Sequence, residues 1–363
     1  MEFPYIYGMK FRAFKYILPF AIYFGAWRSF HSYGWVIFLP VIIAFGIIPL
    51  VELFLAPDTK NLDEAEEAIA KKDRLYDWFL YLMVPMQYLA LYWFLTGITD
   101  ESLLWWERLG RILGMGLACG TFGINVGHEL GHRINIPEQW MAKALLLTSL
   151  YTHFFIEHNK GHHKNVSTPV DPSSAPLGMS LYAFWIRSVS GTWIGAWHIA
   201  ADELRKKGLP ALHWENEMLQ LQILQIGFVT AIGWMFGWEA CGYFIIAAIV
   251  GFLLLETVNY IEHYGLRRKE TQPGKYERAL PHHSWNSNHV LGRLMLFELS
   301  RHSDHHYLAS RKYQILRHHD EAPQLPTGYP GSMVLATIPP LWFLVMDKRI
   351  NAYIRSAGKQ HAV

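Results

Sequence analysis

Long apolar runs alternate with polar segments along this chain, and the length of the runs predicts an integral membrane protein. A helix needs about 20 mostly apolar residues to cross the hydrocarbon core of a bilayer. Six runs approach that length, although the first is interrupted by Pro19 and has polar ends. The six expected spans are residues 16–33, 35–56, 78–98, 109–126, 218–238 and 240–261.

Short links join the expected spans in pairs, so three helical hairpins are predicted. The links are Gly34, residues 99–108 and Glu239. Residues 127–217 and 266–363 are too long to be turns, and we expect them to form a cytoplasmic cap of helices and loops. The predicted fold is therefore a single all-α membrane domain with a cap on one face. Surface helices in the cap are expected near residues 139–157 and 181–207.

The cytoplasmic side is assigned from the lysine and arginine side chains, which gather at one end of the expected spans. Arg12 and Lys15 precede the first span, and both cap segments are rich in basic residues. The turns on the opposite side hold few, among them Arg28 and Arg108. Positively charged loops face the cytoplasm in membrane proteins. Both termini and both cap segments are therefore expected on that side.

Composition agrees with a membrane protein and argues against several other classes. Hydrophobic residues make up 52% of the chain and charged residues only 17%, against about 25% charged residues in soluble domains. Cys119 and Cys241 lie in apolar runs and form no Cys-x-x-Cys pair, which argues against disulfides, a zinc ribbon or an iron–sulfur cluster. The net charge of +2, without a basic block rich in aromatic residues, gives no indication of nucleic-acid binding. Nineteen histidines are the unusual feature.

Three imidazoles fall within the six residues from His158 to His163. On an α-helix His158 and His162 would share one face, with His163 about 100° round from it. This spacing suits a metal ion, because neutral imidazole is the commonest metal ligand in proteins. A solvated turn rich in histidine has the same sequence pattern, so the segment decides nothing alone.

Three further segments place histidines at the same expected membrane face. His128 and His132 continue the fourth span at a spacing of one helical turn, and His263 lies at the end of the sixth. On a helix His302 would share a face with the histidine pair at 305–306. One four-coordinate zinc ion cannot use so many ligands, whereas two metal ions can.

A two-metal site made only of imidazoles restricts the chemistry. The absence of thiolates argues against copper(I) and iron–sulfur centres, while imidazole suits zinc, iron, copper and nickel alike. A site beneath lipid-embedded helices favours an apolar substrate, and activation of its C–H bonds requires redox chemistry with O₂. Zinc has no redox role, so the membrane setting favours a redox metal.

Two other classes of protein explain less of the pattern. His128-Glu129-Leu130-Gly131-His132 is similar to the H-E-x-x-H segment of zinc proteases, but a protease leaves the other histidines unexplained. A metal transporter would place histidines inside the spans along a pathway. Here the clusters gather at one end, outside the apolar runs.

The arrangement His-x-x-x-His, His-x-x-x-His-His and His-x-x-His-His resembles the membrane di-iron superfamily of lipid desaturases and hydrocarbon hydroxylases. Within it, residues 128–132, 157–163, 259–265 and 299–306 closely resemble the bacterial membrane-bound alkane monooxygenases. The resemblance covers roughly residues 35–346, and no expected ligand departs from the pattern. It is extended by Pro281-His282-His283-Ser284-Trp285-Asn286-Ser287-Asn288-His289 and Leu325-Pro326-Thr327-Gly328-Tyr329-Pro330.

The resemblance implies a di-iron enzyme with six spanning helices in the bacterial inner membrane. It would use O₂ to hydroxylate the terminal methyl group of an n-alkane to a primary alcohol, with electrons from rubredoxin and a NAD(P)H-dependent rubredoxin reductase. With two cysteines the chain holds no Cys₄ rubredoxin site, so the donor would be a separate protein or a fused domain absent here. A fatty-acyl desaturase or hydroxylase is the alternative. The iron ligands that the resemblance implies are His128, His132, His158, His162, His163, His263, His302, His305 and His306.

Polar side chains next to the expected ligands are candidates for orienting them, because ligating histidines usually donate their other ring N–H to a carboxylate or carbonyl. Glu256, an acid inside the sixth span, is a further functional candidate. Four histidines that flank the site are expected to be structural: His153, His282, His283 and His289. The orienting candidates are Glu129, Glu157, Asn259, Glu262 and Asp304.

An apolar substrate would enter from the lipid and lie in a slot between helices, with its terminal methyl group at the metals. Basic residues of the cap could attract an acidic electron donor, or could simply contact lipid head groups. The slot is expected to be lined by Phe122, Ile124 and Asn125 on the fourth span and by Phe252, Leu255 and Val258 on the sixth. The basic residues are Arg205, Lys206, Lys207, Arg267, Arg268 and Lys269.

Overall fold

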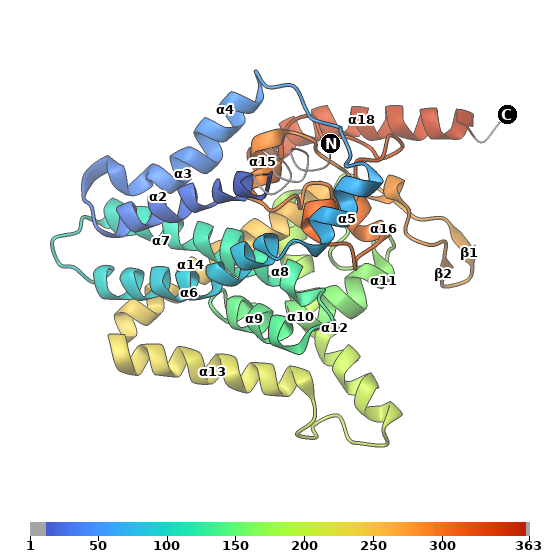
Figure 1. Ribbon diagram of the computed structural model, residues 1–363. Helices are drawn as coiled ribbons and strands as arrows, with labels where there is room; N and C mark the ends of the chain where they lie inside the picture. The colour runs from blue at the N-terminus through green and yellow to red at the C-terminus, as the bar shows by residue number, and fades with distance from the viewer. Residues whose placement is uncertain (1–11, 361–363) are drawn as a thin grey trace.

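The computed structural model describes residues 12–360, and these residues are mostly helical, with one small two-stranded sheet (Figure 1). Five helical stretches among them are long and apolar enough to cross a membrane. The second stretch is α6, the fourth is α13 and the fifth is α14. In chain order the five are Gly34–Glu52, Leu75–Gly97, Trp105–Gly131, Glu217–Phe236 and Trp238–His263.

Two of these stretches contain π-helical turns. The stretch Gly34–Glu52 consists of η2 (Gly34–Phe38), α3 (Leu39–Ile42), the π-helix η3 (Ile43–Ile47) and α4 (Ile48–Glu52). The stretch Trp105–Gly131 consists of α7 (Trp105–Ala118), the π-helix η4 (Cys119–Ile124) and α8 (Asn125–Gly131).

The first expected span differs from the prediction. Its residues form η1 (Ala13–Ile17) and α2 (Phe20–Phe30), which are separated at Pro19. Proline cannot donate a backbone hydrogen bond, so it favours a break at this point. A helix of 11 residues such as α2 spans only about 16 Å, about half of the hydrocarbon core. Five spanning candidates are therefore observed where six were expected.

α14 lies at the centre of the bundle, where it packs against α7, η4, α12 and α13. Glycines permit its close approach to the third stretch. A Cβ atom on Gly251 would lie 2.5 Å from Cβ of Cys119, and one on Gly116 would lie 2.6 Å from Cβ of Val250. Small residues at a helix interface allow such close packing in membranes. This contact bears on function, because expected metal ligands lie near the ends of both helical stretches.

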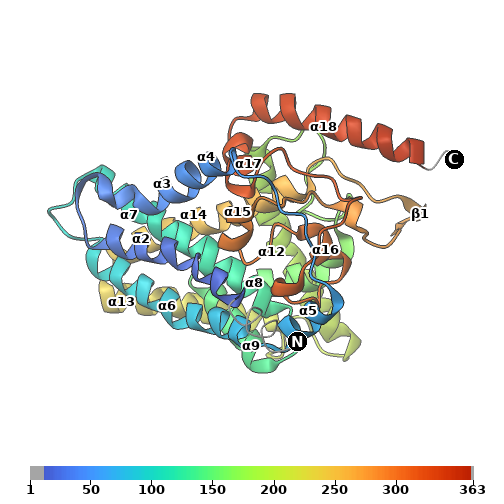
Figure 2. The same ribbon diagram turned by 45° about the horizontal axis from the view of Figure 1, so that its top comes forward.

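The cap gathers at one end of the bundle. Figures 1 and 2 show α6, α7 and α14 side by side in the bundle, whereas α16 and the β1 hairpin lie on the side of the cap. The surface helix expected at 139–157 is two helices, and that expected at 181–207 is α12. The cap elements are α5 (Glu64–Lys72), α9 (Ile136–Leu147), α10 (Phe154–Glu157), η5 (His158–His162), α11 (His163–Asn165), α12 (Leu181–Lys206), β1 (Glu270–Gln272), β2 (Lys275–Tyr276), η6 (Pro281–His283), α15 (Val290–Met295), α16 (His302–Tyr307), η7 (Tyr313–Ile315), α17 (Tyr329–Ala336) and α18 (Pro339–Gln360).

Candidate metal centre

Four chain segments bring their histidines to one place at the junction of bundle and cap. The segments are the end of α8, the η5–α11 turn, the end of α14 and the short helix α16. All nine expected ligands direct their Nε2 atoms toward one another. Seven of the nine are buried, and His132 and His163 are half-buried.

The nine imidazoles form two groups, and within each group the ligand atoms all lie within 4.8 Å of one another. One group has five histidines and the other has four. We call them the five-histidine group and the four-histidine group. The first contains His128, His132, His158, His163 and His305, and the second contains His162, His263, His302 and His306.

The backbone of η5 decides how the three histidines of the central run are divided. η5 is a π-helical turn, in which the backbone N–H of His163 donates to the carbonyl oxygen of His158 five residues earlier. Residues five apart are therefore aligned, and the Nε2 atoms of His158 and His163 are 3.0 Å apart. His162 joins the other group, with its Nε2 atom 3.2 Å from that of His306. The sequence left open how the three histidines divide between two metals, and the π-turn, unlike an ordinary α-helix, separates His158 from His162. π-turns are frequent at functional sites.

α16 also divides its histidines between the two groups. The Nε2 atoms of His302 and His306 are 2.8 Å apart, as expected for residues one helical turn apart. His305 is rotated about 100° from His306, and its Nε2 atom is 3.0 Å from that of His128. The three histidines that an α-helix would place on one face therefore divide between the two groups. α16 lies between the groups and contributes to both.

The contacts in the five-histidine group fit a bound cation better than hydrogen bonding. Nε2 contacts of 3.0–3.2 Å run in a closed ring through all five histidines. A ring nitrogen carries either one proton or one lone pair, so it can make one good hydrogen bond and not two. Ligand atoms at about 2.1 Å from a shared metal ion lie about 3 Å apart. The donor set therefore fits a metal ion at the centre of the ring.

Burial keeps these imidazoles in the neutral form that binds metals. It lowers the pKa of His132, His158 and His163 well below the usual range of histidine, and repulsion from neighbouring imidazoles lowers each further. Burial is the larger cause, since a charged ring is disfavoured where water is excluded. Protons therefore compete little with a metal ion for these three ligands at neutral pH.

Asp171 orients one ligand and was missed by the sequence prediction. Its fully buried carboxylate accepts a hydrogen bond from Nδ1 of His162 at 2.9 Å. Ser174 Oγ and the backbone N–H of Ser173 donate to the same carboxylate at 2.6 and 3.1 Å. This contact fixes the tautomer that leaves Nε2 of His162 free for a metal. An acid in a Pro-rich loop directly after the histidine run was the available signal.

Two predicted orienting residues bind cationic side chains instead of ligands. Glu129 accepts hydrogen bonds from Arg133 at 2.8 Å and from the backbone N–H of Tyr313 at 3.2 Å. Asp304 accepts from Arg311 and, at 2.7 Å, from Nε2 of His319, which belongs to neither group. Both acids brace the segment that follows α16 against the cap.

The other three candidates lie in different surroundings. Asn259 donates to Glu256 at 3.2 Å. Burial raises the pKa of Glu157 well above its usual range, and the nearby acids Asp171 and Glu256 raise it further. Glu262 has one carboxylate oxygen 3.1 Å from Nε2 of His302, which is the nitrogen that faces the metal position.

Glu256 ties α14 to the cap. Its fully buried carboxylate accepts hydrogen bonds from Tyr151 at 2.6 Å, from Ser188 of α12 and from Asn259 at 3.2 Å. Three donors offset the cost of removing a carboxylate from water. The acid therefore fixes α14 and α12 relative to each other behind the histidines.

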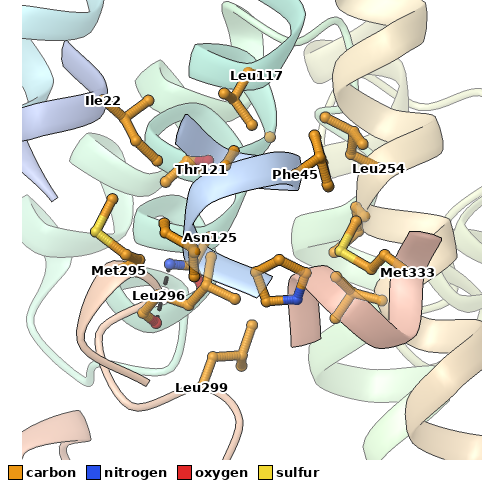
Figure 3. Close-up of a pocket in the computed structure, with 16 residues that line it drawn as sticks. Ile22, Phe45, Leu117, Thr121, Asn125, Leu254, Met295, Leu296, Leu299 and Met333 are labelled. Atoms are coloured by element: carbon orange, nitrogen blue, oxygen red, sulfur yellow. Dashed lines mark hydrogen bonds between the residues drawn. The ribbon is translucent and has the colours of Figure 1, made fainter. Parts of the chain in front are cut away.

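A narrow apolar slot of about 70 Å³ lies between the helices (Figure 3). Asn125, Val258 and Leu299 in its wall each lie three to five residues before a histidine of the centre. Thr121 and Asn125 are the polar side chains in the wall, and Asn125 donates to the carbonyl oxygen of Leu296 at 3.1 Å. The full lining is Ile22, Ala44, Phe45, Ile48, Leu117, Gly120, Thr121, Asn125, Leu254, Leu255, Val258, Met295, Leu296, Leu299, Pro330 and Met333.

Three of the six residues expected in the slot wall are found there: Asn125, Leu255 and Val258. The others pack elsewhere. Phe122 contacts the ring of Tyr23 and Phe252 stacks on Tyr151, while Ile124 is fully buried without lining the slot. The π-turn η4 rotates the fourth span relative to a regular helix, so face assignments based on 3.6 residues per turn fail there.

The flanking histidines lie outside both groups. Nδ1 of His283 accepts the backbone N–H of Leu280 at 3.0 Å, and its Nε2 lies 3.2 Å from the carboxylate of Glu277. His153 contacts Thr192 at 3.4 Å, and His289 contacts Ser287 at 3.1 Å. These three histidines are therefore hydrogen-bonded residues of the cap.

The basic residues proposed to attract a donor differ in their surroundings. Arg205 and Lys207 pair with the exposed acids Asp202 and Glu215, at the end of α12 that projects from the molecule in Figure 1. Arg268 donates to backbone carbonyl oxygens, including those of Lys164 and Glu277, and thereby braces the cap. The exposed members of the set are Arg205, Lys206, Lys207, Arg267 and Lys269.

Comparison with known proteins identifies relatives along most of the chain. Residues 103–333 match the fatty acid desaturase family. Alkane 1-monooxygenase 1 of Pseudomonas aeruginosa is 43% identical over 91% of this chain and 87% of its own length. Alkane 1-monooxygenase 2 of Alcanivorax borkumensis is 37% identical over 93% of this chain and 88% of its own. The xylene/toluene monooxygenase hydroxylase component of Pseudomonas putida is 31% identical over 74% and 72%.

Proposed function

Because the chain belongs to the alkane 1-monooxygenases within the fatty acid desaturase family, we propose that it is a membrane di-iron enzyme that hydroxylates the terminal methyl group of n-alkanes. The reaction consumes O₂, two electrons and two protons and converts the alkane to a primary alcohol and water. The observation that carries this proposal is the pair of histidine groups, whose ligand atoms are spaced as around two cations. Iron bound there supplies the redox chemistry that activates O₂.

The protein's own residues have three tasks in this reaction. The nine imidazoles, which are neutral, hold the metals. Asp171 fixes the tautomer of His162. The apolar wall of the slot excludes water and holds the alkyl chain. Each buried CH₂ group contributes about 0.8 kcal/mol wherever it lies, so selectivity for the terminal carbon comes from the direction of the slot rather than from affinity.

The substrate enters from the lipid through a groove on the outside of the bundle. This groove shares Phe45, Leu254 and Met333 with the slot, and Figure 3 shows these three side chains together on one side of the slot. Trp185 and Val334 line the outer part of the groove. An alkane dissolved in the bilayer would therefore reach the slot without crossing water.

Electrons come from reduced rubredoxin, regenerated by a NAD(P)H-dependent reductase. The two cysteines of the chain are both buried, and a rubredoxin site needs four. The donor is therefore a separate protein or a fused domain. The exposed basic residues of the cap, such as Arg267 and Lys269, would favour an acidic partner through their charge.

Six crossings and a cytoplasmic active site in the bacterial inner membrane complete the proposal. η1 and α2 together supply the first crossing, supported by the exposed apolar side chains of Phe14, Ile17, Phe24 and Trp27. The excess of basic residues on the side of the cap supports its cytoplasmic position.

Metal analysis combined with a turnover assay tests the proposed function. Purified full-length protein in lipid nanodiscs should hold about two irons per chain and convert n-octane to 1-octanol only with reduced rubredoxin. Zinc-loaded protein is the control and should be inactive. A fatty-acyl substrate in the same assay tests the alternative function. Octanol formation by the zinc form, or desaturation of the acyl chain without alkane turnover, would contradict the proposal.

A further inference from the structure

A carboxylate reaches the metal-facing side of the four-histidine group. Glu262 lies at the end of α14, next to His263, and is only 1% exposed. One carboxylate oxygen, Oε2, lies 3.1 Å from Nε2 of His302. The other, Oε1, accepts a hydrogen bond from the hydroxyl of Tyr329 at 2.7 Å. The tyrosine therefore holds the carboxylate in place with its other oxygen beside His302, one member of the group.

The surroundings of His302 show that this contact is not an ordinary hydrogen bond. Its Nε2 atom lies 2.8 Å from Nε2 of His306, 3.2 Å from Nε2 of His263 and 3.1 Å from Glu262. One ring nitrogen has a single bonding direction in the plane of the ring. It cannot serve three partners at once, whereas one ligand atom of a cation can have several neighbouring ligand atoms at distances of this size. Of the four histidines, His302 is the one that the carboxylate contacts.

A bound metal removes the remaining explanation for the contact. Once Nε2 of His302 ligates a cation it carries no proton, so it cannot donate to Glu262. The carboxylate would then lie about 3 Å from a coordinated nitrogen, which is the usual spacing of neighbouring ligands. The role predicted for Glu262, to accept the other ring N–H, requires Nδ1 instead, and the observed contact is with Nε2.

Charge and ligand number favour the same assignment. Nine neutral imidazoles carry no charge to balance two buried cations, which are costly where water is excluded, and Asp171 lies behind His162, at its Nδ1. Glu129 and Asp304 are already paired with arginines, while Glu262 has no cationic partner among the described residues. The four-histidine group also has one ligand fewer than its neighbour.

We propose that Oε2 of Glu262 is a ligand of the metal ion held by the four-histidine group. Each group then supplies five protein ligands, and one of the two metals has an anionic oxygen donor that the other lacks. The assignment rests on the two-metal centre of the proposed function. It makes the two metal positions chemically different.

Cobalt(II) titration of Glu262→Gln in the full-length protein tests this assignment without any measurement of turnover. Wild-type protein should bind two cobalt ions per chain, counted by mass spectrometry of the metal, with d–d absorption that reports the number and type of ligands. The variant should bind one of the two at least tenfold more weakly, with a changed spectrum for that ion alone. Glu239→Gln is the control, an exposed acid at the other end of the same helix that should keep two ions and the wild-type spectrum.

Three other results of the cobalt titration would decide against the assignment of Glu262. Two ions bound to Glu262→Gln with wild-type affinity and spectrum would overturn the assignment and leave the proposed function intact. A wild-type protein that binds no ion at the histidines would overturn both. If Glu262→Gln does not fold, Glu262→Asp replaces it, because aspartate keeps the charge but shortens the reach by one methylene. Equal cobalt affinity in that variant and the wild type would also overturn the assignment.

Discussion

At the scale of single residues, the histidines of the metal centre depend on partner residues that lie far apart in the sequence or that no motif marks. The nine histidines stand out in the sequence, and the structure brings all nine together. Their division into groups could not be predicted, because it follows from a π-turn and from the placement of α16 between the groups. Asp171 was missed because its contact with His162 depends on how the Pro-rich loop folds back, although its place just after the histidine run was a signal.

Asp171→Asn should weaken metal binding by the four-histidine group about 10- to 100-fold, the usual cost of losing a partner that orients a ligand. The neutral amide no longer stabilises the ligating tautomer of His162. Competition of the loaded protein with a calibrated chelator measures the affinity. Asp320→Asn, whose side chain is fully exposed, is the control. Unchanged affinity in Asp171→Asn would show that the contact orients nothing.

Glu298 fixes the segment that leads into α16. Its buried carboxylate pairs with Lys15 at 3.0 Å and with Arg293 at 2.6 Å, and accepts the hydroxyl proton of Tyr16 at 2.6 Å. Burial alone would raise the pKa of Glu298, but Lys15 and Arg293 more than reverse this and hold it well below the usual range. The contacts tie the N-terminal helices to the chain just before His302.

This carboxylate should make stability depend on pH in a defined direction. A pKa lowered in the folded state contributes stability that is complete above the unfolded pKa of about 4.3, and the contribution is lost as pH falls through the folded value. Glu298→Gln should cost about 3–5 kcal/mol at pH 7, as for other broken buried ion pairs. Thermal unfolding in detergent should show the gap between variant and wild type narrowing below pH 4. A gap that widens there would contradict this account.

At the scale of elements, run length located the five long spans, because a bilayer demands apolar length and little else. It did not anticipate the break at Pro19 or the splitting of the surface helix near residue 150. Periodicity failed at the π-turn η4, where Phe122 and Ile124 do not line the slot, and Phe252 of the regular helix α14 does not line it either. What orients the ligands within these elements is close packing of α14 on the third stretch.

Two glycines of α14 give opposite predictions for the same substitution. Gly251→Ala places a Cβ atom 2.5 Å from Cβ of Cys119, whereas Gly242→Ala meets nothing within 4 Å. The first should cost about 1–3 kcal/mol through overpacking and should loosen iron retention at His128 and His263. The second should be neutral or stabilise the helix by about 0.5–1 kcal/mol. Thermal unfolding and iron content measure both, and equal behaviour of the two variants would refute the role given to close packing.

At the scale of the whole molecule, four segments spread over residues 128–306 meet at the two histidine groups. Bound metal should therefore cross-link bundle and cap. The location of the clusters at one membrane face was predictable from the spans, but their convergence is a tertiary property of the cap. The slot likewise combines residues from six separate parts of the chain, so periodicity along one helix could not define it.

Removal of the metals should lower the stability of the whole fold. Each ion at 100 times its dissociation constant adds about 2.7 kcal/mol to the folded state. Chelator-treated protein should melt several degrees lower, and iron(II) should restore the original midpoint while magnesium should not. An unchanged midpoint after the metals are removed would mean that the histidine groups do not hold the cap to the bundle.

The central claim is that this centre inserts one oxygen atom from O₂ into the terminal methyl group of an alkane. The most direct measurement is turnover of n-octane under ¹⁸O₂ by purified protein with reduced rubredoxin, followed by mass spectrometry of the products. The account predicts 1-octanol that carries one ¹⁸O atom. Alcohol labelled from water, or oxygen inserted mainly at internal carbons, would contradict it.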